Sequence, residues 1–147
     1  MIKIGKLADY ALLITDYLAL SSDSLCTTDE LSKATHLPVA TVRKLLKKLV
    51  DAKLVNSYLG SNGGYSLSTP PPEISIASVI VAVEGPIAIT ECAISAGSCS
   101  LSKECHLKEN WGILNKFFVD TLTNISIADM SQAMSENLVK FNLGLKP

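Results

Sequence analysis

Three of the four cysteines in this 147-residue chain lie close together, at Cys92, Cys99 and Cys105, and His106 follows the last of them. The two gaps are seven and six positions long, and Gly97 lies within the first gap. Zinc sites usually contain cysteine pairs roughly two to four residues apart, and this segment has no such pair. Three thiolates on one loop can instead hold an iron–sulfur cluster and leave one iron for a further ligand. The spacing therefore predicts a loop that senses through such a cluster.

Two other roles for the three cysteines stay open. A redox switch needs only one or two reactive thiols, and some cysteines only fill space in a core. A disulfide is not expected, because Asp9 and Asp16 interrupt the stretch where a secretory signal would lie, and no apolar run is long enough to span a membrane. The chain is therefore expected to be cytoplasmic, where thiols stay reduced, and to have no membrane partner. The fourth cysteine, Cys26, stands apart and is expected to be structural.

A long helix is predicted directly after the cysteine segment, over residues 104–124. Apolar side chains recur along it three or four positions apart, close to the seam of a coiled coil, at Trp111, Leu114, Phe118, Leu122 and Ile125. Such a helix needs an apolar surface to pack against. The rest of the same chain is one candidate. A second copy of the helix is favoured, because a symmetric dimer matches palindromic half-sites on DNA.

The first half of the chain predicts a helix-turn-helix. An apolar stripe indicates a helix over residues 6–20, and a short helix then begins at Thr27 and Thr28, with Thr28 as its cap. Pro38 breaks this helix and starts another, which runs to about residue 52 and has a basic outer side. That side can enter the major groove, while His36 in the turn caps the helix or contacts phosphate. The DNA contacts predicted here are Thr28, Ala40, Thr41, Arg43, Lys44, Lys47 and Lys48.

A β-hairpin is predicted after the basic helix, with strands over 54–58 and 65–68 and a glycine-rich tip between them. The tip can approach a sugar–phosphate backbone closely, so Ser61, Asn62 and Gly63 join the predicted DNA contacts. The rival interpretations are a merely solvated basic face and an enzyme's phosphate loop, but the chain has no P-loop lysine with a following helix. The predicted fold class is mainly α with a small β-wing: a winged helix-turn-helix followed by a long C-terminal dimerisation helix.

Charge is divided unequally along the chain, whose net charge is −1. Residues 1–68 hold eight basic and six acidic residues, and the remainder is acidic. A near-neutral total therefore does not exclude DNA binding. Two parts are expected: a winged helix-turn-helix DNA-binding domain over 1–69, and a second part over 70–147. The second part would hold a short strand (74–76), a short helix (78–84), the sensor loop (85–105), the dimerisation helix (about 105–125), a last short helix (127–134) and a tail.

The layout resembles the Rrf-two family of bacterial winged-helix regulators over roughly residues 1–135. The resemblance lies in the run from Lys6 to Ala11, in residues 54–57 leading to Gly63-Gly64-Tyr65, in the three-cysteine loop, and in Trp111. It implies a homodimer that binds double-stranded promoter DNA, carries a [2Fe–2S] or [4Fe–4S] cluster on the three cysteines, and regulates the genes of iron–sulfur cluster assembly. The alternative is a repressor that responds to nitric oxide or thiol redox state without a stable cluster. Neither enzyme activity nor a small-molecule substrate is expected, since the sequence offers no nucleophile–base pair.

Three features depart from the family pattern, and the first is a cysteine gap one residue longer than the commonest spacing. The second concerns the fourth cluster ligand. Members that regulate cluster assembly place a histidine where this chain has Lys108, and His106 is out of register, whereas members that sense nitric oxide use an aspartate that matches Asp9. Asp9, reaching from the partner subunit, is therefore preferred over His106. The third is Leu59, which stands in the wing where many members have an arginine that reads the minor groove.

Overall fold

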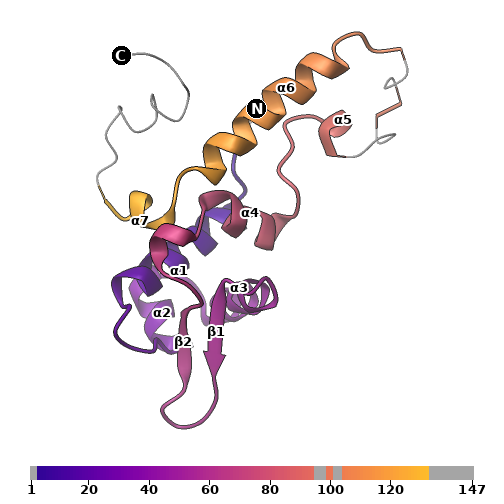
Figure 1. Cartoon of the computed structure of the whole chain (residues 1–147). Helices are drawn as coiled ribbons and strands as arrows, with labels where there is room; N and C mark the ends of the chain where they lie inside the picture. The colour runs from indigo at the N-terminus through magenta and orange to yellow at the C-terminus, as the bar shows by residue number, and fades with distance from the viewer. Residues whose placement is uncertain (1–2, 95–98, 101–103, 133–147) are drawn as a thin grey trace.

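The computed structural model describes residues 3–94, 99–100 and 104–132, and it shows a helical winged domain from which one long helix projects (Figure 1). The winged domain begins with three helices and a two-stranded antiparallel hairpin, namely α1 (Lys6–Leu20), α2 (Thr28–Thr35), α3 (Val39–Asp51), β1 (Val55–Tyr58) and β2 (Gly64–Leu67). This order of elements confirms the predicted winged helix-turn-helix. None of the helices in the described ranges is both long and apolar enough to cross a membrane.

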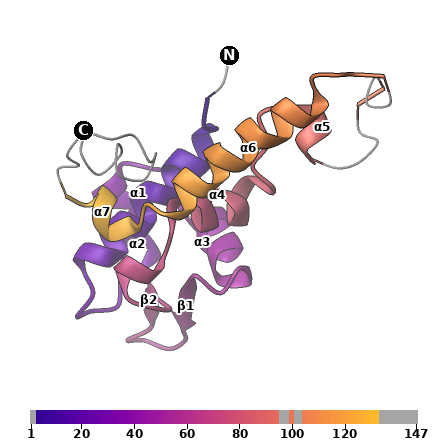
Figure 2. The same ribbon diagram turned by 45° about the horizontal axis from the view of Figure 1, so that its top comes forward.

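The second part of the chain connects the winged domain to the cysteine segment. Its elements are η1 (Pro71–Glu73), α4 (Ile76–Glu84), α5 (Glu91–Ile94), α6 (Lys108–Thr123) and α7 (Ile127–Met130). Helix α4 packs against α1 and α3 in the winged domain and also contacts α6. Helix α6 extends away from that domain, with α5 packed against it toward its far end (Figure 2). The cysteine segment is therefore linked to α1 and α3 of the winged domain through α6 and α4.

The hydrophobic core lies where α1, α3 and α4 meet. The apolar side of α3, opposite its basic side, is buried there, together with Ile14 of α1 and Val79 of α4. The largest fully buried apolar side chains include Ile14, Leu18, Leu31, Leu45, Leu46, Leu49 and Val79. Burial of one leucine or isoleucine side chain contributes roughly 1.5–3 kcal/mol. This one cluster therefore fixes how α3 and α4 are placed relative to α1.

Helix α4 begins at Ile76, two residues before the predicted start. The Ser75 hydroxyl accepts a hydrogen bond from the Ser78 N–H at 3.1 Å and so caps the helix. The predicted strand over 74–76 is reduced to a single bridge between Ser75 and the residue that precedes α7. The helix ends at Gly85, whose φ of 90° lies in the left-handed region that favours glycine.

Helices α6 and α7 are shorter than predicted. Helix α6 begins at Lys108 and not near residue 104, so Cys105 and His106 lie before it in the chain. Helix α7 ends at Met130, inside the predicted range 127–134. Residues 133–147, which hold the expected tail, lie outside the described residues.

Helix α2 is capped by Thr27, and the prediction that Thr28 is the cap was wrong. The Thr27 hydroxyl accepts from the Glu30 N–H at 3.3 Å, and the Glu30 carboxylate accepts from the Thr27 N–H at 2.7 Å. This pair is a reciprocal capping box. The hydrogen bonds from the Thr27 backbone N–H and hydroxyl lower the pKa of the Glu30 carboxyl. Thr28 lies in the first turn of the helix instead.

Replacing Thr27 by alanine should lower the free energy of unfolding by about 1 kcal/mol, because the first N–H groups of α2 lose an acceptor. Glu30→Gln should reduce the pH dependence of stability. Because the pKa of Glu30 is lowered on folding, its carboxylate stabilises the fold at neutral pH, and this contribution is lost as the pH falls through that lowered pKa. Urea denaturation at neutral and acidic pH measures both effects. An equal loss in Thr28→Ala would contradict the assignment of the cap.

Cys26 ties the hairpin to the start of α2. Its backbone N–H donates to the Tyr65 carbonyl at 3.0 Å, and its carbonyl accepts from the Tyr65 N–H at 2.9 Å. The Cys26 residue is only 4% exposed. A Cβ atom at Gly64 would lie 2.9 Å from the Cys26 carbonyl oxygen, so the two segments can approach this closely only with glycine at that position. Cys26 is therefore structural, as predicted, and holds β2 against the helical part of the domain.

Candidate nucleic-acid interface and cysteine segment

One side of α3 presents cations to solvent. Its apolar side is buried against the core, whereas Arg43, Lys44 and Lys47 are exposed and form no ion pair among the described residues. Ala40 is also exposed, and Thr41 is half-buried. This side has the small and basic side chains that approach base edges and phosphates in a major groove. The arrangement matches the expected orientation of a recognition helix, while the individual contacts remain predictions.

The wing adjoins this basic side. Arg43 and Lys47 of α3 line one hollow together with Ser57 of β1 and Tyr65 of β2, so helix and hairpin form one continuous surface. Asp51, at the end of α3, also lines the hollow and makes that end less positive. A ligand that contacts the middle of α3 would therefore meet the hairpin as well.

The wing tip carries the three remaining predicted DNA contacts. Ser61 and Asn62 are exposed, and Gly63 is half-buried. A Cβ atom at Gly63 would lie 2.3 Å from the Tyr58 carbonyl oxygen, so the tight turn requires glycine there. The tip thus offers short polar side chains on a closely folded backbone.

Lys48 differs from the other cations of α3. It is half-buried, and its Nζ donates a hydrogen bond to the carbonyl oxygen of Val83, near the C-terminus of α4. The C-terminal carbonyl groups of a helix carry partial negative charge, which favours a lysine at this place. The structure therefore directs Lys48 toward α4 and away from the exposed basic side, which argues against the predicted DNA contact.

His36 ends α2 with a left-handed backbone, φ 56°, and its side chain is exposed. It occupies the C-cap position of the helix, in the turn before α3, where the sequence placed it. The half-buried Thr28 lies at the other end of α2. Thr28 stays a predicted DNA contact, and for His36 both predicted roles, as a helix cap or a phosphate contact, stay open.

The three clustered cysteines flank the junction of α5 and α6. Cys92 lies on α5, Cys99 in the connection, and Cys105 just before α6. All three are half-buried free thiols. The Thr90 hydroxyl lies 3.2 Å from the Cys92 sulfur, within hydrogen-bond distance. Free, partly accessible thiols with a neighbouring polar group suit either metal ligation or redox chemistry.

Asn115 of α6 holds the segment that leads to Cys92. Its Oδ1 accepts from the Ile89 N–H at 2.9 Å, and its Nδ2 donates to the Ile87 carbonyl at 3.5 Å. The sequence reasoning did not identify this residue. The one feature of the sequence that could have identified Asn115 is its residue type, because asparagine is a weak helix former and stronger helix formers are common beside an apolar stripe. Asn115 therefore connects the cysteine segment mechanically to the long helix.

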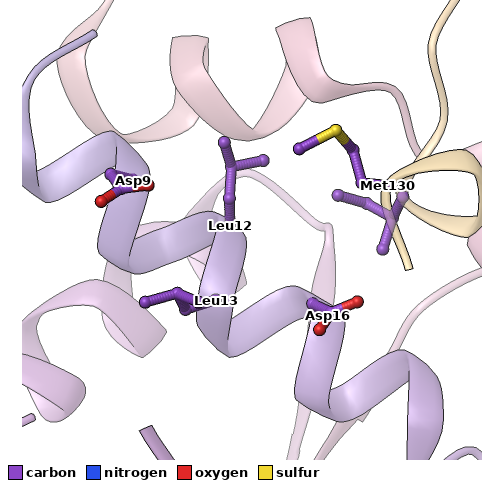
Figure 3. Close-up of a pocket in the computed structure, with 6 residues that line it drawn as sticks. Asp9, Leu12, Leu13, Asp16 and Met130 are labelled. Carbon is purple, nitrogen blue, oxygen red and sulfur yellow. The ribbon is translucent and has the colours of Figure 1, made fainter. Parts of the chain in front are cut away.

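The proposed cluster ligands are not gathered into one site. Among the described residues, no group of three or more His, Cys, Asp and Glu side chains is close enough to hold a metal ion. Asp9 is exposed on α1 and lines a hollow with Leu12, Leu13, Asp16 and Met130 (Figure 3). His106 is exposed before α6. The donor chemistry fits an iron–sulfur cluster, because three free thiols are soft ligands, but ligation would require the cysteines to converge.

A basic helix, an adjoining wing and a projecting helix that carries a cysteine segment define a winged helix-turn-helix transcriptional regulator. Residues 4–133 match the Rrf2 family, described as iron-dependent transcriptional regulators, and the chain belongs to this family. Regulators of this family bind DNA and are typically dimeric. The chain is accordingly a regulator and not an enzyme.

Similar proteins extend over most of the chain. Protein aau3 of Rhizobium meliloti is 31% identical over 147 residues, which cover 98% of this chain and 93% of that protein. The HTH-type transcriptional regulator NsrR of Oceanobacillus iheyensis is 30% identical over 118 residues, 79% of this chain and 78% of that protein. The solved structure of CymR, the global cysteine regulator of B. subtilis, has a TM-score of 0.71 at 25% identity and covers 89% of this chain and 97% of its own.

Proposed function

We propose that this chain forms a homodimer whose affinity for promoter DNA depends on an iron–sulfur cluster held by Cys92, Cys99 and Cys105. The carrying observation is that three free, half-buried thiols lie on a segment attached to the helix that projects from the DNA-binding domain. The family's description as iron-dependent regulators supports the same input. The regulated genes would be those of iron–sulfur cluster assembly. Cluster occupancy of the regulator would then control expression of the genes that make new clusters.

A continuous set of contacts could carry a change from the cysteines to the DNA. When bound, a cluster supplies a labile cross-link between the three thiolates. Asn115 transfers a movement of the segment before Cys92 to α6, and α6 contacts α4. Lys48 then links the end of α4 to α3 through the Val83 carbonyl. A shift of α4 would therefore change the position of the recognition helix directly.

The fourth ligand would come from outside the three cysteines. Asp9 is exposed on α1 and so is accessible to the cysteine segment of a second subunit, whereas His106 directly follows Cys105. A carboxylate ligand binds iron less tightly than a thiolate, which suits a cluster that must be lost or modified during sensing. Asp9→Ala should therefore lower cluster stability more than His106→Ala does.

Anaerobic purification tests the proposal most directly. The protein should be coloured, contain iron and inorganic sulfide, and show cluster absorption and electron paramagnetic resonance signals after reduction. Its affinity for promoter DNA should differ between the iron-loaded and iron-free forms. A colourless protein that takes up no iron on reconstitution, or equal DNA affinity in both forms, would refute cluster sensing.

A thiol-responsive regulator without a cluster is the second candidate. The observation in its favour is the likeness to CymR, described as a global cysteine regulator, together with the three free thiols. In that case mild oxidants such as disulfides should change DNA affinity in iron-free protein, and reduction should reverse the change. Iron content and oxidant response in the same preparation separate the two candidates.

Removing Lys47 should weaken DNA binding about equally for all sequences and make the plot of log affinity against log salt shallower by about one unit. Lys47 is exposed on the basic side of α3, so its charge is available to a phosphate. Lys48→Gln is the matched control. Because Lys48 contacts Val83, this change should leave the salt slope almost unaltered and reduce the difference in affinity between iron-loaded and iron-free protein. Titrations at several salt concentrations, read by fluorescence anisotropy, measure both quantities, and a similar change of slope in the two variants would contradict the assignment.

A further inference from the structure

The tip of the wing presents an isolated apolar side chain. Leu59 is 97% exposed, the highest value among the large apolar residues in the described part of the chain. One exposed leucine is common on protein surfaces and by itself needs no explanation. The position of Leu59 is what distinguishes it, because it directly follows β1 and begins the loop that joins β1 to β2 at the tip of the hairpin. This loop points away from the helices of the winged domain (Figure 1).

The turn that carries Leu59 is closely constrained. The Gly63 N–H donates to the Gly60 carbonyl at 3.0 Å, and Tyr58 pairs with Gly64 at the last rung of the hairpin. Gly60 has a φ of 106°, a conformation that favours glycine. The leucine side chain is therefore held outward by a short turn.

The wing also lacks the charges that usually bind a phosphate backbone. Residues 54–69 contain no lysine, arginine, aspartate or glutamate. The hairpin nevertheless borders the exposed basic side of α3, since Ser57 and Tyr65 line the same hollow as Arg43 and Lys47. When α3 lies in a major groove, the hairpin tip is placed toward the neighbouring minor groove, as in other winged and arm-bearing helix-turn-helix proteins. The tip would present one apolar side chain, Leu59, to the minor groove, together with glycines, a serine and an asparagine.

We propose that Leu59 inserts into the minor groove of the promoter as an apolar wedge and partly separates one base step. Leucine is among the residues that proteins use in this way, and the wedge widens the groove and kinks the duplex. The cost is lowest at pyrimidine–purine steps such as TA and CA, which unstack most easily. The wing would thus select its target by the deformability of one step and not by a charge in a narrow groove.

The consequence for specificity differs from that of an arginine in the same place. An arginine favours stiff A-tracts, whose narrow minor groove has an enhanced negative potential. A leucine wedge should favour a flexible step, and its contribution to affinity should vary little with salt. Leu59→Arg should therefore change how the wing recognises DNA, from a preference for a flexible base step to a preference for a narrow minor groove.

The test uses the full-length protein and duplexes that it selects from a random DNA pool. With 2-aminopurine placed at the selected flexible step, binding of the wild type should increase fluorescence, because the base loses its stacking. Leu59→Ala should abolish this increase and lower affinity roughly ten-fold, the scale expected for burial of one leucine side chain, with the salt slope unchanged. Leu59→Arg should select A-tracts and steepen the salt slope by about one unit.

Leu20→Ala is the matched control, because Leu20 is also strongly exposed (70%) but lies at the end of α1, where it lines a hollow with Pro71 and Ser131 and not with the hairpin tip. It should retain wild-type affinity and fluorescence. Circular dichroism would show that all variants keep the fold. The proposal is overturned if Leu59→Ala binds the selected duplexes with unchanged affinity and the same fluorescence increase. It is also overturned if Leu59→Ala changes only self-association in sedimentation, since the leucine would then be a protein contact.

Discussion

Replacing any one of Cys92, Cys99 and Cys105 by alanine should abolish iron binding and leave the winged domain folded. None of the three side chains belongs to the hydrophobic core, and each is a half-buried free thiol. Loss of one thiolate leaves two thiolates and the one weaker ligand proposed here, which is one ligand fewer than the usual four, so the cluster should no longer be held. Iron and sulfide per subunit, measured after anaerobic purification, should therefore fall from near stoichiometric values to background.

Cys26→Ala is the control for this series. Cys26 is buried next to the wing and should lose stability, on the order of 1 kcal/mol for the apolar surface removed, while iron content stays at the wild-type value. The three ligand variants should bind DNA with the affinity of the iron-free wild type and no longer respond to iron or nitric oxide. A single cysteine variant that keeps full iron content would show that its sulfur is not a ligand. Loss of iron in Cys26→Ala at unchanged stability would show that the ligand set is misassigned.

Placing aspartate at Ile113 and Phe117 together should convert the protein to a monomer and lower its affinity for palindromic DNA by at least about a hundredfold, because two half-sites are no longer held by one particle. Helix α6 has 16 residues, and none of them is buried. Ile113 is 67% exposed and Phe117 is 49% exposed. An exposed apolar face of this kind indicates a protein interface. Two charges in its centre would have to be desolvated on association.

Light scattering coupled to size-exclusion chromatography measures the mass, and titration with one-half-site and two-half-site duplexes separates dimerisation from DNA contact. Lys116→Ala is the matched control on the same helix, because Lys116 forms a surface ion pair with Asp120 and its removal should leave the dimer intact. The thermal unfolding midpoint of the winged domain should change little in the double variant. A dimer that persists with both aspartates present would place the interface elsewhere.

Much of the winged domain could be predicted from the sequence because its signals are local. The apolar stripes of α1 and α3 and the glycine-rich tip each follow from the spacing of a few neighbouring residues. The error at the start of α2 was also local, since Thr27 and Thr28 can both cap a helix and only Thr27 is paired by Glu30. The sequence does separate the two candidates, because Glu30 lies three residues after Thr27 in the capping-box spacing, whereas the matching residue for Thr28 is Leu31.

The interactions that the sequence did not indicate join distant segments. Lys48 lies on the flank of a basic helix, and only the position of α4 gives it the Val83 carbonyl as a partner. Asn115 similarly acts on residues far from it in the chain, at Ile87 and Ile89. The three cysteines were noticed from their spacing, but spacing does not determine whether their sulfurs converge. Such contacts depend on tertiary packing, which local periodicity does not encode.

Because no residue of α6 is fully buried within the described part of its own subunit, and Leu122 near its C-terminus packs against a core cluster, the far end of α6 with its cysteine segment can change in evolution without disturbing the main core of the winged domain. Substitutions, insertions or lost cysteines near the far end of α6 leave the buried contacts of α1, α3 and α4 unaffected. The chemical signal to which such a protein responds can therefore change during evolution while the winged DNA-binding domain is retained. This gives a physical basis for a single fold serving proteins named for different inputs, among them the cysteine regulator CymR.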